Sequence, residues 1–438
     1  MDLVRIRLLT NEPNYFLSMH SSKSIARSCL AFSICLSFSC AISAQTLQQQ
    51  YQLALANDPA LLASQHRHQA TKEYTNIANA ALRPVLSAGT TQSLGFESGA
   101  TTDIYNASLA LSLRIDALYA ADSAEAAIKQ SNFGLQASRQ KLLADTIGNY
   151  FNITKQQPQI NSIHAQIKSA KRSLARIQKQ RQLGLATQVQ VAEVENNVQQ
   201  LNLSLLQAQQ KLQEVRNTLT LSTGQIIDQQ LPGINLTTSL PTTESLQLDY
   251  WWESAKQNNL TLLAATAGAQ KSYHDYQQTD AGKYPTGSIA GNHYSHQSDT
   301  LTLQITGKLY DGGLNQSQTQ QARLNWQASQ EDLRVKQRAT KQQLDNMLYN
   351  LRNNAEQITL QQSLLDTADF ALAATEKEYQ LGVTDLVSVL EAEQKVATKE
   401  VNLINARYDQ IILQTNLQML VGSLNDNNLA ILDQLLDE

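Results

Sequence analysis

Two halves of this 438-residue chain carry the same pattern about 200 residues apart. A Leu-Gly turn at Gly184 is followed by a Thr-Gly stop at Gly224, and the interval of 40 residues recurs between Gly382 and Gly422. Upstream, the spacings of 10 and 27 residues recur in two sets: Leu47, Asn57 and Pro84, then Leu248, Asn258 and Pro285. Solenoid units repeat every 20–50 residues or so. The longer period therefore indicates a duplicated half-molecule, and each chain should build similar structures twice.

The beginning of the chain is typical of a secretory signal peptide over residues 1–44. Lys23 and Arg27 precede an apolar run that ends in small residues near Ala44, which is the order of such signals. A membrane anchor is the alternative, but the run is shorter than the ~18 residues that a spanning helix needs. Because Met19 stands where a signal of ordinary length would begin, residues 1–18 are interpreted as an untranslated extension.

Cysteine usage and charge exclude several classes of site. Cys29, Cys35 and Cys40 all lie inside the predicted signal, so a mature chain from Gln45 has no disulfide and no thiolate metal site. The residues before Cys40 match a lipidation signal poorly. The predicted mature chain has a net charge near −6 and no basic stripe, which argues against nucleic acid as a partner.

Each repeat is predicted to contain one β-hairpin. Apolar and polar residues alternate from Tyr105 to Ile115 and from Leu301 to Leu309, and weaker strand patterns precede them at Leu86–Phe96 and Thr286–Tyr294. The strands, about 85–115 and 286–309, have the length of about ten residues that a tilted membrane-spanning strand requires. A soluble hairpin packed on helices remains the alternative.

Long helices fill most of the remaining sequence. Residues 47–83 are predicted to be helical, with a break at Asp58-Pro59. Apolar residues in a coiled-coil rhythm of three and four lead into and away from Gly184 and again Gly382. In the first repeat they are Ile160, Ile163, Ile167, Ala170, Leu174, Ile177, Val191, Val194, Val198, Leu201, Leu205, Ala208, Leu212, Val215 and Leu219. This pattern predicts two antiparallel helical hairpins, with tips near residues 184 and 382. One helix from Leu118 to Gly184 would be interrupted at Pro158.

These patterns divide the chain into a first repeat (45–224), a connector (225–247) and a second repeat (248–438). The sequence shows no catalytic constellation, phosphate loop or cofactor motif, and we expect no enzyme activity and no cofactor. The histidine pairs at His66-x-His68 and His293-x-x-His296 are poorly arranged for metal binding, and no metal is expected.

The sequence resembles the TolC family of outer membrane channels over nearly the whole predicted mature chain. The segment Tyr379–Ala392 is similar to the periplasmic tip of that family. Further matches are Tyr150-Phe151-Asn152, Leu309-Tyr310-Asp311-Gly312-Gly313, and Asn405-Ala406-Arg407-Tyr408 with Leu417, Leu420, Gly422 and Leu429. Their order and spacing support the resemblance in both repeats.

The resemblance implies a mainly α fold with membrane β-barrel strands, in which a β-hairpin and a long coiled-coil hairpin are duplicated. It implies a homotrimer, a trimeric α/β barrel to which each chain gives four strands in outer membrane lipid, and a helical tunnel in the periplasm. Oligomerisation also solves a physical problem, because open strand edges are not tolerated in lipid. The implied function is the outer membrane channel of a tripartite efflux or type I secretion system. Its partners would be a periplasmic membrane-fusion adaptor and an inner-membrane pump of the ABC or RND type.

The resemblance also implies site residues. The positions of the family's pore-narrowing Asp rings are Ser388 and Glu391, and its gate tyrosine is Tyr379. The polar partner position in the first repeat is Gln190, whereas Thr384 replaces an expected Arg. The adaptor-binding tips would be Leu183, Gly184 and Leu185 in the first repeat and Leu381, Gly382 and Val383 in the second.

Two other classes of protein fit the sequence less well. A periplasmic coiled-coil adaptor would have one helical hairpin instead of two, and a structural coiled coil would lack the period-2 strands. The cargo, the pump and the opening mechanism are not specified by the sequence.

Overall fold

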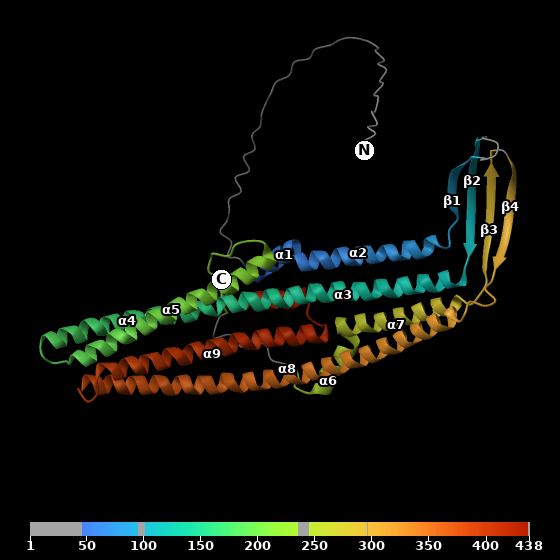
Figure 1. The fold of residues 1–438 in the computed structure, drawn as a ribbon. Coiled ribbons are helices and arrows are strands. Elements are labelled where there is room, and N and C mark those ends of the chain that lie inside the picture. The colour runs from blue at the N-terminus through green and yellow to red at the C-terminus, as the bar shows by residue number, and fades with distance from the viewer. Residues whose placement is uncertain (1–45, 95–100, 235–244, 296, 437–438) are drawn as a thin grey trace, which may run out of the picture. The chain divides into compact units, whose positions relative to one another are not determined.

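The computed structural model describes residues 46–94, 101–234, 245–295 and 297–436, so the predicted signal peptide lies outside the described residues (Figure 1). The first half comprises α1 (Leu47–Asn57), α2 (Pro59–Ala80), β1 (Val85–Leu94), β2 (Thr101–Leu113), α3 (Ile115–Thr154), α4 (Gln156–Gln182) and α5 (Gln188–Thr223). The second half comprises α6 (Leu248–Asn258), α7 (Leu260–Ala281), β3 (Thr286–Tyr294), β4 (Gln297–Thr306), α8 (Leu314–Gln380), α9 (Leu386–Val421) and α10 (Asp426–Asp433). The predicted order of elements is therefore present twice.

The four strands form one antiparallel sheet in the order β1-β2-β3-β4. Its central pair, β2 with β3, joins the two repeats, and Leu113 lies opposite Gly287 at the end nearest the helices. Within the described sheet, β1 and β4 are the edge strands. The expectation of two β-hairpins is confirmed.

Two strands end two or three residues before their approximate predicted ends. The second strand ends at Leu113, and Ile115 begins α3, where Asp116 in the first turn favours the helix N-terminus. The fourth strand ends at Thr306 instead of Leu309. Thr306 pairs with Thr286, the first residue of β3, and Pro285 before it has no backbone N–H with which to extend the ladder.

The predicted break at Asp58-Pro59 separates α1 from α2. The Asp58 carboxylate accepts a hydrogen bond from the Leu61 N–H at 2.7 Å, which makes Asp58 the N-cap of α2. Asn259 repeats this between α6 and α7, because its side-chain oxygen accepts from the Leu262 N–H at 2.8 Å. The same local chemistry therefore divides the first helices of both repeats.

The interruption in the first long helix lies earlier than predicted. α3 ends at Thr154, and α4 begins at Gln156, two residues before Pro158. Proline donates no hydrogen bond, and its ring crowds the carbonyl four residues back, which here belongs to Thr154. The break therefore falls one turn ahead of Pro158. The second repeat has no such proline in α8, which runs unbroken for 67 residues.

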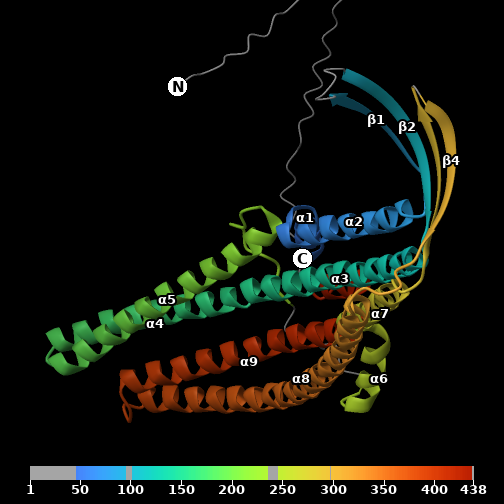
Figure 2. The same ribbon diagram turned by 45° about the vertical axis from the view of Figure 1, so that its right-hand side comes forward.

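The predicted coiled-coil stripes lie inside the helical hairpins. Ile160, Ile163, Ile167 and Ala170 of α4 pack with Val198, Leu201 and Ala208 of α5, and all are buried. Near the sheet the repeats meet through α3 and α7, where the Ser123 hydroxyl donates to Asp275. Figures 1 and 2 show the sheet at one end of these long helices and the hairpin turns at the other. None of the described helices is both long and apolar enough to cross a membrane.

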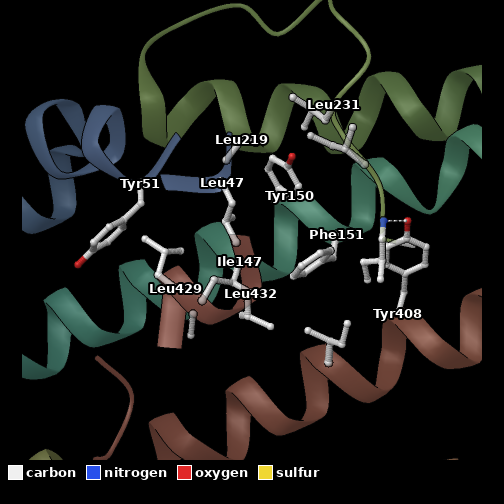
Figure 3. Close-up of a cluster of buried hydrophobic side chains, with 14 of the residues drawn as sticks. Leu47, Tyr51, Ile147, Tyr150, Phe151, Leu219, Leu231, Tyr408, Leu429 and Leu432 are labelled. Atoms are coloured by element: carbon white, nitrogen blue, oxygen red, sulfur yellow. Dashed lines mark hydrogen bonds between the residues drawn. The ribbon is translucent and has the colours of Figure 1, made fainter. Parts of the chain in front are cut away.

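The largest buried cluster lies midway along the helices and includes residues of the connector and α10 (Figure 3). The buried Tyr408 hydroxyl accepts a hydrogen bond from the Ile234 N–H at 3.1 Å, and the Tyr150 hydroxyl donates to the Pro232 carbonyl at 3.1 Å. A Cβ on Gly233 would lie 3.0 Å from the Tyr408 hydroxyl oxygen. These contacts give a structural reason for the aromatic residues in the segments that resemble the family.

Candidate gate and docking tips

The two hairpin turns, 183–187 and 381–385, are called the tips. In the first, the Gly184 N–H donates to the Arg181 carbonyl and the Leu185 N–H to the Gln180 carbonyl. The second has the same pair of bonds, from Gly382 and Val383. This is the Schellman arrangement, which needs a left-handed residue after the helix. Gly184 and Gly382 supply it, with φ of +75° and +74°.

Both tips present apolar side chains to the exterior. Leu183 and Leu185 are 73% and 75% exposed, and Leu381 and Val383 are 79% and 75% exposed. Exposed apolar residues that recur at one place in both repeats form a candidate contact surface for another protein.

Polar side chains close the first turn of the helix that follows each tip. Thr187 and Gln190 form a capping box, in which the Gln190 amide oxygen accepts from the Thr187 N–H at 2.9 Å. In the second tip the Asp385 carboxylate accepts from both the N–H and the hydroxyl of Ser388, at 2.9 and 2.8 Å. The bond from the Ser388 N–H is the main reason that the pKa of Asp385 lies below its usual range. The predicted gate residues Gln190 and Ser388 thus bond within their own helices.

The predicted gate residue Tyr379 contacts the other hairpin. Its hydroxyl accepts a hydrogen bond from the Arg176 guanidinium at 3.3 Å, and Arg176 Cζ lies 5.9 Å from the centre of the Tyr379 ring. This combination of a hydrogen bond and a cation–π contact joins α4 to α8 one to two turns from the tips. Sequence reasoning missed Arg176. The sequence does contain one signal for such a contact, because α4 has six Lys and Arg residues and no acidic residue to pair with them in the same helix.

The two hairpins also meet along a seam between α4 and α9. The Ser169 hydroxyl donates to the Glu393 carboxylate at 2.5 Å, and the Lys155 ammonium lies 2.9 Å from the Asp409 carboxylate. Nearer the tips, Leu390 of α9 is buried in a cluster with Ile177 of α4 and with Val191 and Val194 of α5. Glu393 is therefore a residue of this seam.

Glu391 occupies a different side of α9. It is exposed, whereas its neighbours Leu390 and Ala392 are buried. It lies nine residues beyond Gly382, about two and a half helical turns into the hairpin. The equivalent position of the first repeat, nine residues beyond Gly184, is Glu193, which is also exposed. Sequence reasoning identified Glu391 but not Glu193.

Over the described ranges, no group of three or more metal-ligating side chains lies close enough together to hold an ion. The site therefore consists of apolar tips, helix caps, inter-hairpin contacts and exposed carboxylates. The exposed apolar tips suit a surface that binds another protein.

Comparisons with known proteins identify the class to which this arrangement belongs. The family model for "Outer membrane efflux protein" matches residues 50–225 and 251–423. The outer membrane protein TolC of Vibrio cholerae is 24% identical over 416 residues, which cover 89% of this chain and 93% of that protein. The alkaline protease secretion protein AprF of Pseudomonas aeruginosa is 24% identical and covers 87% of this chain and 85% of its own length.

A solved structure supports the fold independently. The CmeC outer membrane channel of Campylobacter jejuni superposes with a TM-score of 0.76 at 15% identity, over 89% of this chain and 90% of that chain.

The chain belongs to the outer membrane efflux protein family, the TolC family. It is accordingly a transport protein of the outer membrane whose helices form a periplasmic tunnel, and it functions as an efflux or secretion channel. Family membership implies a trimer that works with adaptors and pumps.

Proposed function

We propose that this chain is the outer membrane channel of a tripartite efflux or type I secretion system. Cargo would pass from an inner-membrane pump of the ABC or RND type, through a periplasmic adaptor, into the tunnel. The observation that carries the proposal is the pair of tips, because both turns have the same backbone geometry and expose two large apolar residues each. The family membership supplies the setting.

The tips are proposed as the adaptor-binding surface. Their glycines fix the turns, while Leu183, Leu185, Leu381 and Val383 offer apolar area that is available for a partner. One relative of this chain is named for the secretion of alkaline protease, and this similarity favours a protein as the cargo. Cargo itself would be selected by the pump that the adaptor recruits.

The test replaces the apolar tip residues and keeps both glycines. Leu183→Ser with Leu185→Ser, or Leu381→Ser with Val383→Ser, should leave a trimer in the outer membrane, since exposed side chains leave no cavity when shortened. Export should be lost in a deletion strain complemented with these variants. Proteins released into the medium report secretion, and retention of a cationic dye reports efflux. Normal values of both with the tip variants would contradict docking at the tips.

We further propose that Glu391, one from each chain, forms a ring of carboxylates at the narrow end of the tunnel. Like charges held close together focus a negative potential and favour cations. Tyr379 and the capped residues Ser388 and Gln190 lie along the same part of the hairpins and complete the proposed gate. Glu391→Ala should weaken cation selectivity and block by divalent metal ions in single-channel recordings. Glu193→Ala is the matched variant in the first repeat. Unchanged selectivity and block in Glu391→Ala would remove Glu391 from the pore.

A further inference from the structure

The two helical hairpins, α4 with α5 and α8 with α9, have opposite charge near their tips. Residues 164–203 of the first hairpin contain six Lys and Arg residues and two Glu residues, which gives a net charge of +4. Gly382 lies 198 residues after Gly184, so the counterpart segment is 362–401. It contains three Lys residues and eight Asp and Glu residues, a net charge of −5. The hairpins therefore share the geometry of their tips but not their charge.

Four basic side chains gather on one face of α4, which is called the basic face: Lys168, Lys171, Arg172 and Lys179. Their spacing places them within a sector of about 100° around the helix. All four are exposed, and none forms an ion pair with a carboxylate of the described residues. The expectation that the chain has no basic stripe was wrong at this face, because these residues are separated along the sequence and gather only on the folded helix.

The basic face is directed away from both helices that α4 contacts. α4 packs on α5 through the buried residues Ile163, Ile167 and Ala170, which lie about 120° around the helix from the basic face. On its other flank it meets α9, where the Ser169 hydroxyl donates to Glu393 (Figure 2). Both neighbouring helices belong to the same chain, so the basic face is available to a partner of a different kind.

The second hairpin reverses the charge at two counterpart positions of this face. The counterparts of Lys168 and Lys171 are Asp366 and Asp369, and both are exposed on α8. An acidic partner segment would be attracted at the first pair and repelled at the second. Because specificity needs repulsion at the wrong site as well as attraction at the right one, the two faces can discriminate between hairpins of the same shape.

The basic face continues into the first tip. Lys179 lies four residues before Leu183, about one helical turn, and the face extends for about 17 Å from Lys168 to Lys179. That length matches about three turns of a helix lying alongside. Because a single partner helix can cover both the apolar tip and the basic face, a protein suits this surface better than a small free anion does.

We propose that the basic face binds an acidic helical segment of the periplasmic adaptor, and that Asp366 and Asp369 exclude the same segment from the second hairpin. The adaptor thus distinguishes the two hairpins of one chain by their charge. The inference rests on the proposed docking of the adaptor at the tips.

Photocross-linking in cells tests this assignment at a matched pair of sites. Ala175 lies within the basic face, four residues from both Lys171 and Lys179, and its counterpart in the second hairpin is Ala373, which is also exposed. The photoreactive residue p-benzoylphenylalanine replaces either alanine in the full chain, and only variants that export normally are compared. The adaptor should be captured several-fold more at Ala175 than at Ala373. Mass spectrometry should find the adduct in an adaptor segment whose acidic residues are spaced by three or four.

Charge reversal separates recognition by charge from simple proximity. Lys168→Glu with Lys171→Glu should lower capture at Ala175 about tenfold or more, because like charges then face each other across the contact. Lys336→Glu with Arg338→Glu is the control. It changes the net charge equally at exposed positions of α8 more than 40 residues before the second tip, and capture should not change.

The reverse change in the second hairpin should create a binding face. Asp366→Lys with Asp369→Lys should raise capture at Ala373 toward the level found at Ala175 in the unmodified hairpin. Equal capture at the two alanines before any charge is changed would overturn the inference, and so would an adduct in a basic or uncharged segment of the adaptor.

A third probe site distinguishes this failure from failure of the proposed docking. The same photoreactive residue replaces Leu185 in the first tip, which is 75% exposed. Capture of the adaptor at Leu185 without capture at Ala175 removes the basic face alone and leaves docking at the tips in place. No capture at Leu185, Ala175 or Ala373 in cells that export normally overturns both.

Discussion

Replacing Arg176 by alanine should favour the conducting state of the tunnel. The change removes the hydrogen bond and the cation–π contact to Tyr379, which together join the two hairpins of one chain near their tips. An exposed cation–π contact contributes about 0.5–1 kcal/mol, and a hydrogen bond as long as this one adds about 0.5 kcal/mol. The contact therefore stabilises the joined hairpins by about 1–1.5 kcal/mol in each chain.

The trimer multiplies this effect if the three chains open together. Three contacts then amount to about 3–4.5 kcal/mol, and each 1.4 kcal/mol is a factor of ten, so the ratio of open to closed channels should rise roughly 100- to 1000-fold. Tyr379→Phe removes only the hydrogen bond, and the ratio should rise about tenfold.

Single-channel recording of purified trimers in planar bilayers measures the open probability. Lys168→Ala is the matched control, because it removes one positive charge from an exposed position of the same helix. Arg176→Ala should also admit into cells a large hydrophilic antibiotic that the intact outer membrane excludes. Indistinguishable open probabilities for Arg176→Ala and Lys168→Ala would refute the assignment of the contact as a restraint on opening.

Three further predictions concern the framework around the gate. Gly422→Ala should lower the thermal midpoint of the trimer far more than Gly224→Ala: both have positive φ, but a Cβ on Gly422 would lie 2.0 Å from the Asn258 carbonyl oxygen, whereas the nearest atom at Gly224 is 3.4 Å away. Tyr408→Phe should destabilise the chain by about 1–3 kcal/mol in urea unfolding, because it leaves a buried backbone N–H of the connector unpaired. Asp385 has a lowered pKa, so its capping contribution is complete at neutral pH and is lost as the pH falls from about 3.9 through the folded-state pKa. Asp385→Asn keeps a cap that does not titrate, and its unfolding midpoint should lose less than that of the wild type between pH 5 and pH 3, roughly the range of carboxyl titration.

The fold could be predicted because its signals are local. The alternation from Tyr105 onward has a single structural interpretation, and Gly184 and Gly382 occur where only a turn with positive φ completes a hairpin. The ends of elements were less predictable. Leu309 continues the alternation of β4, but Pro285 on the opposite strand offers no partner beyond Thr286. The sequence of β4 alone does not indicate where its partner strand begins.

The contacts between hairpins could not be predicted, because their partners lie more than 200 residues apart. Nothing near Tyr379 in the sequence indicates Arg176, and Glu393 resembles any solvated helix residue until Ser169 lies opposite it. The family pattern indicates Gln190 as a gate residue, and the structure shows that its side chain also caps α5. This cap has a local signal, because Thr187-x-x-Gln190 has the spacing of a capping box.

The duplication makes one last prediction about opening. Gly382 lies 198 residues after Gly184, so the counterparts of Arg176 and Tyr379 are Ala374 and Arg181. If neighbouring chains of the trimer pack as the two repeats of one chain pack, Ala374 and Arg181 meet between copies, and this pair forms neither a hydrogen bond nor a cation–π contact. The seam within a chain thus has a restraint that the seam between copies lacks, and opening should begin between copies.

Adding the missing restraint should reverse this order. Ala374→Arg with Arg181→Tyr should place a guanidinium over a tyrosine of the next copy and lower the open probability, roughly tenfold or more if three contacts of about 0.5 kcal/mol act together. Each single substitution changes charge or bulk without completing the pair and serves as its control. The effect of the double variant must exceed the sum of the single effects, in free energy, because only the pair makes the contact. An additive result would mean that Ala374 and Arg181 do not meet across the interface, and the order of opening argued from the two seams would fail with it.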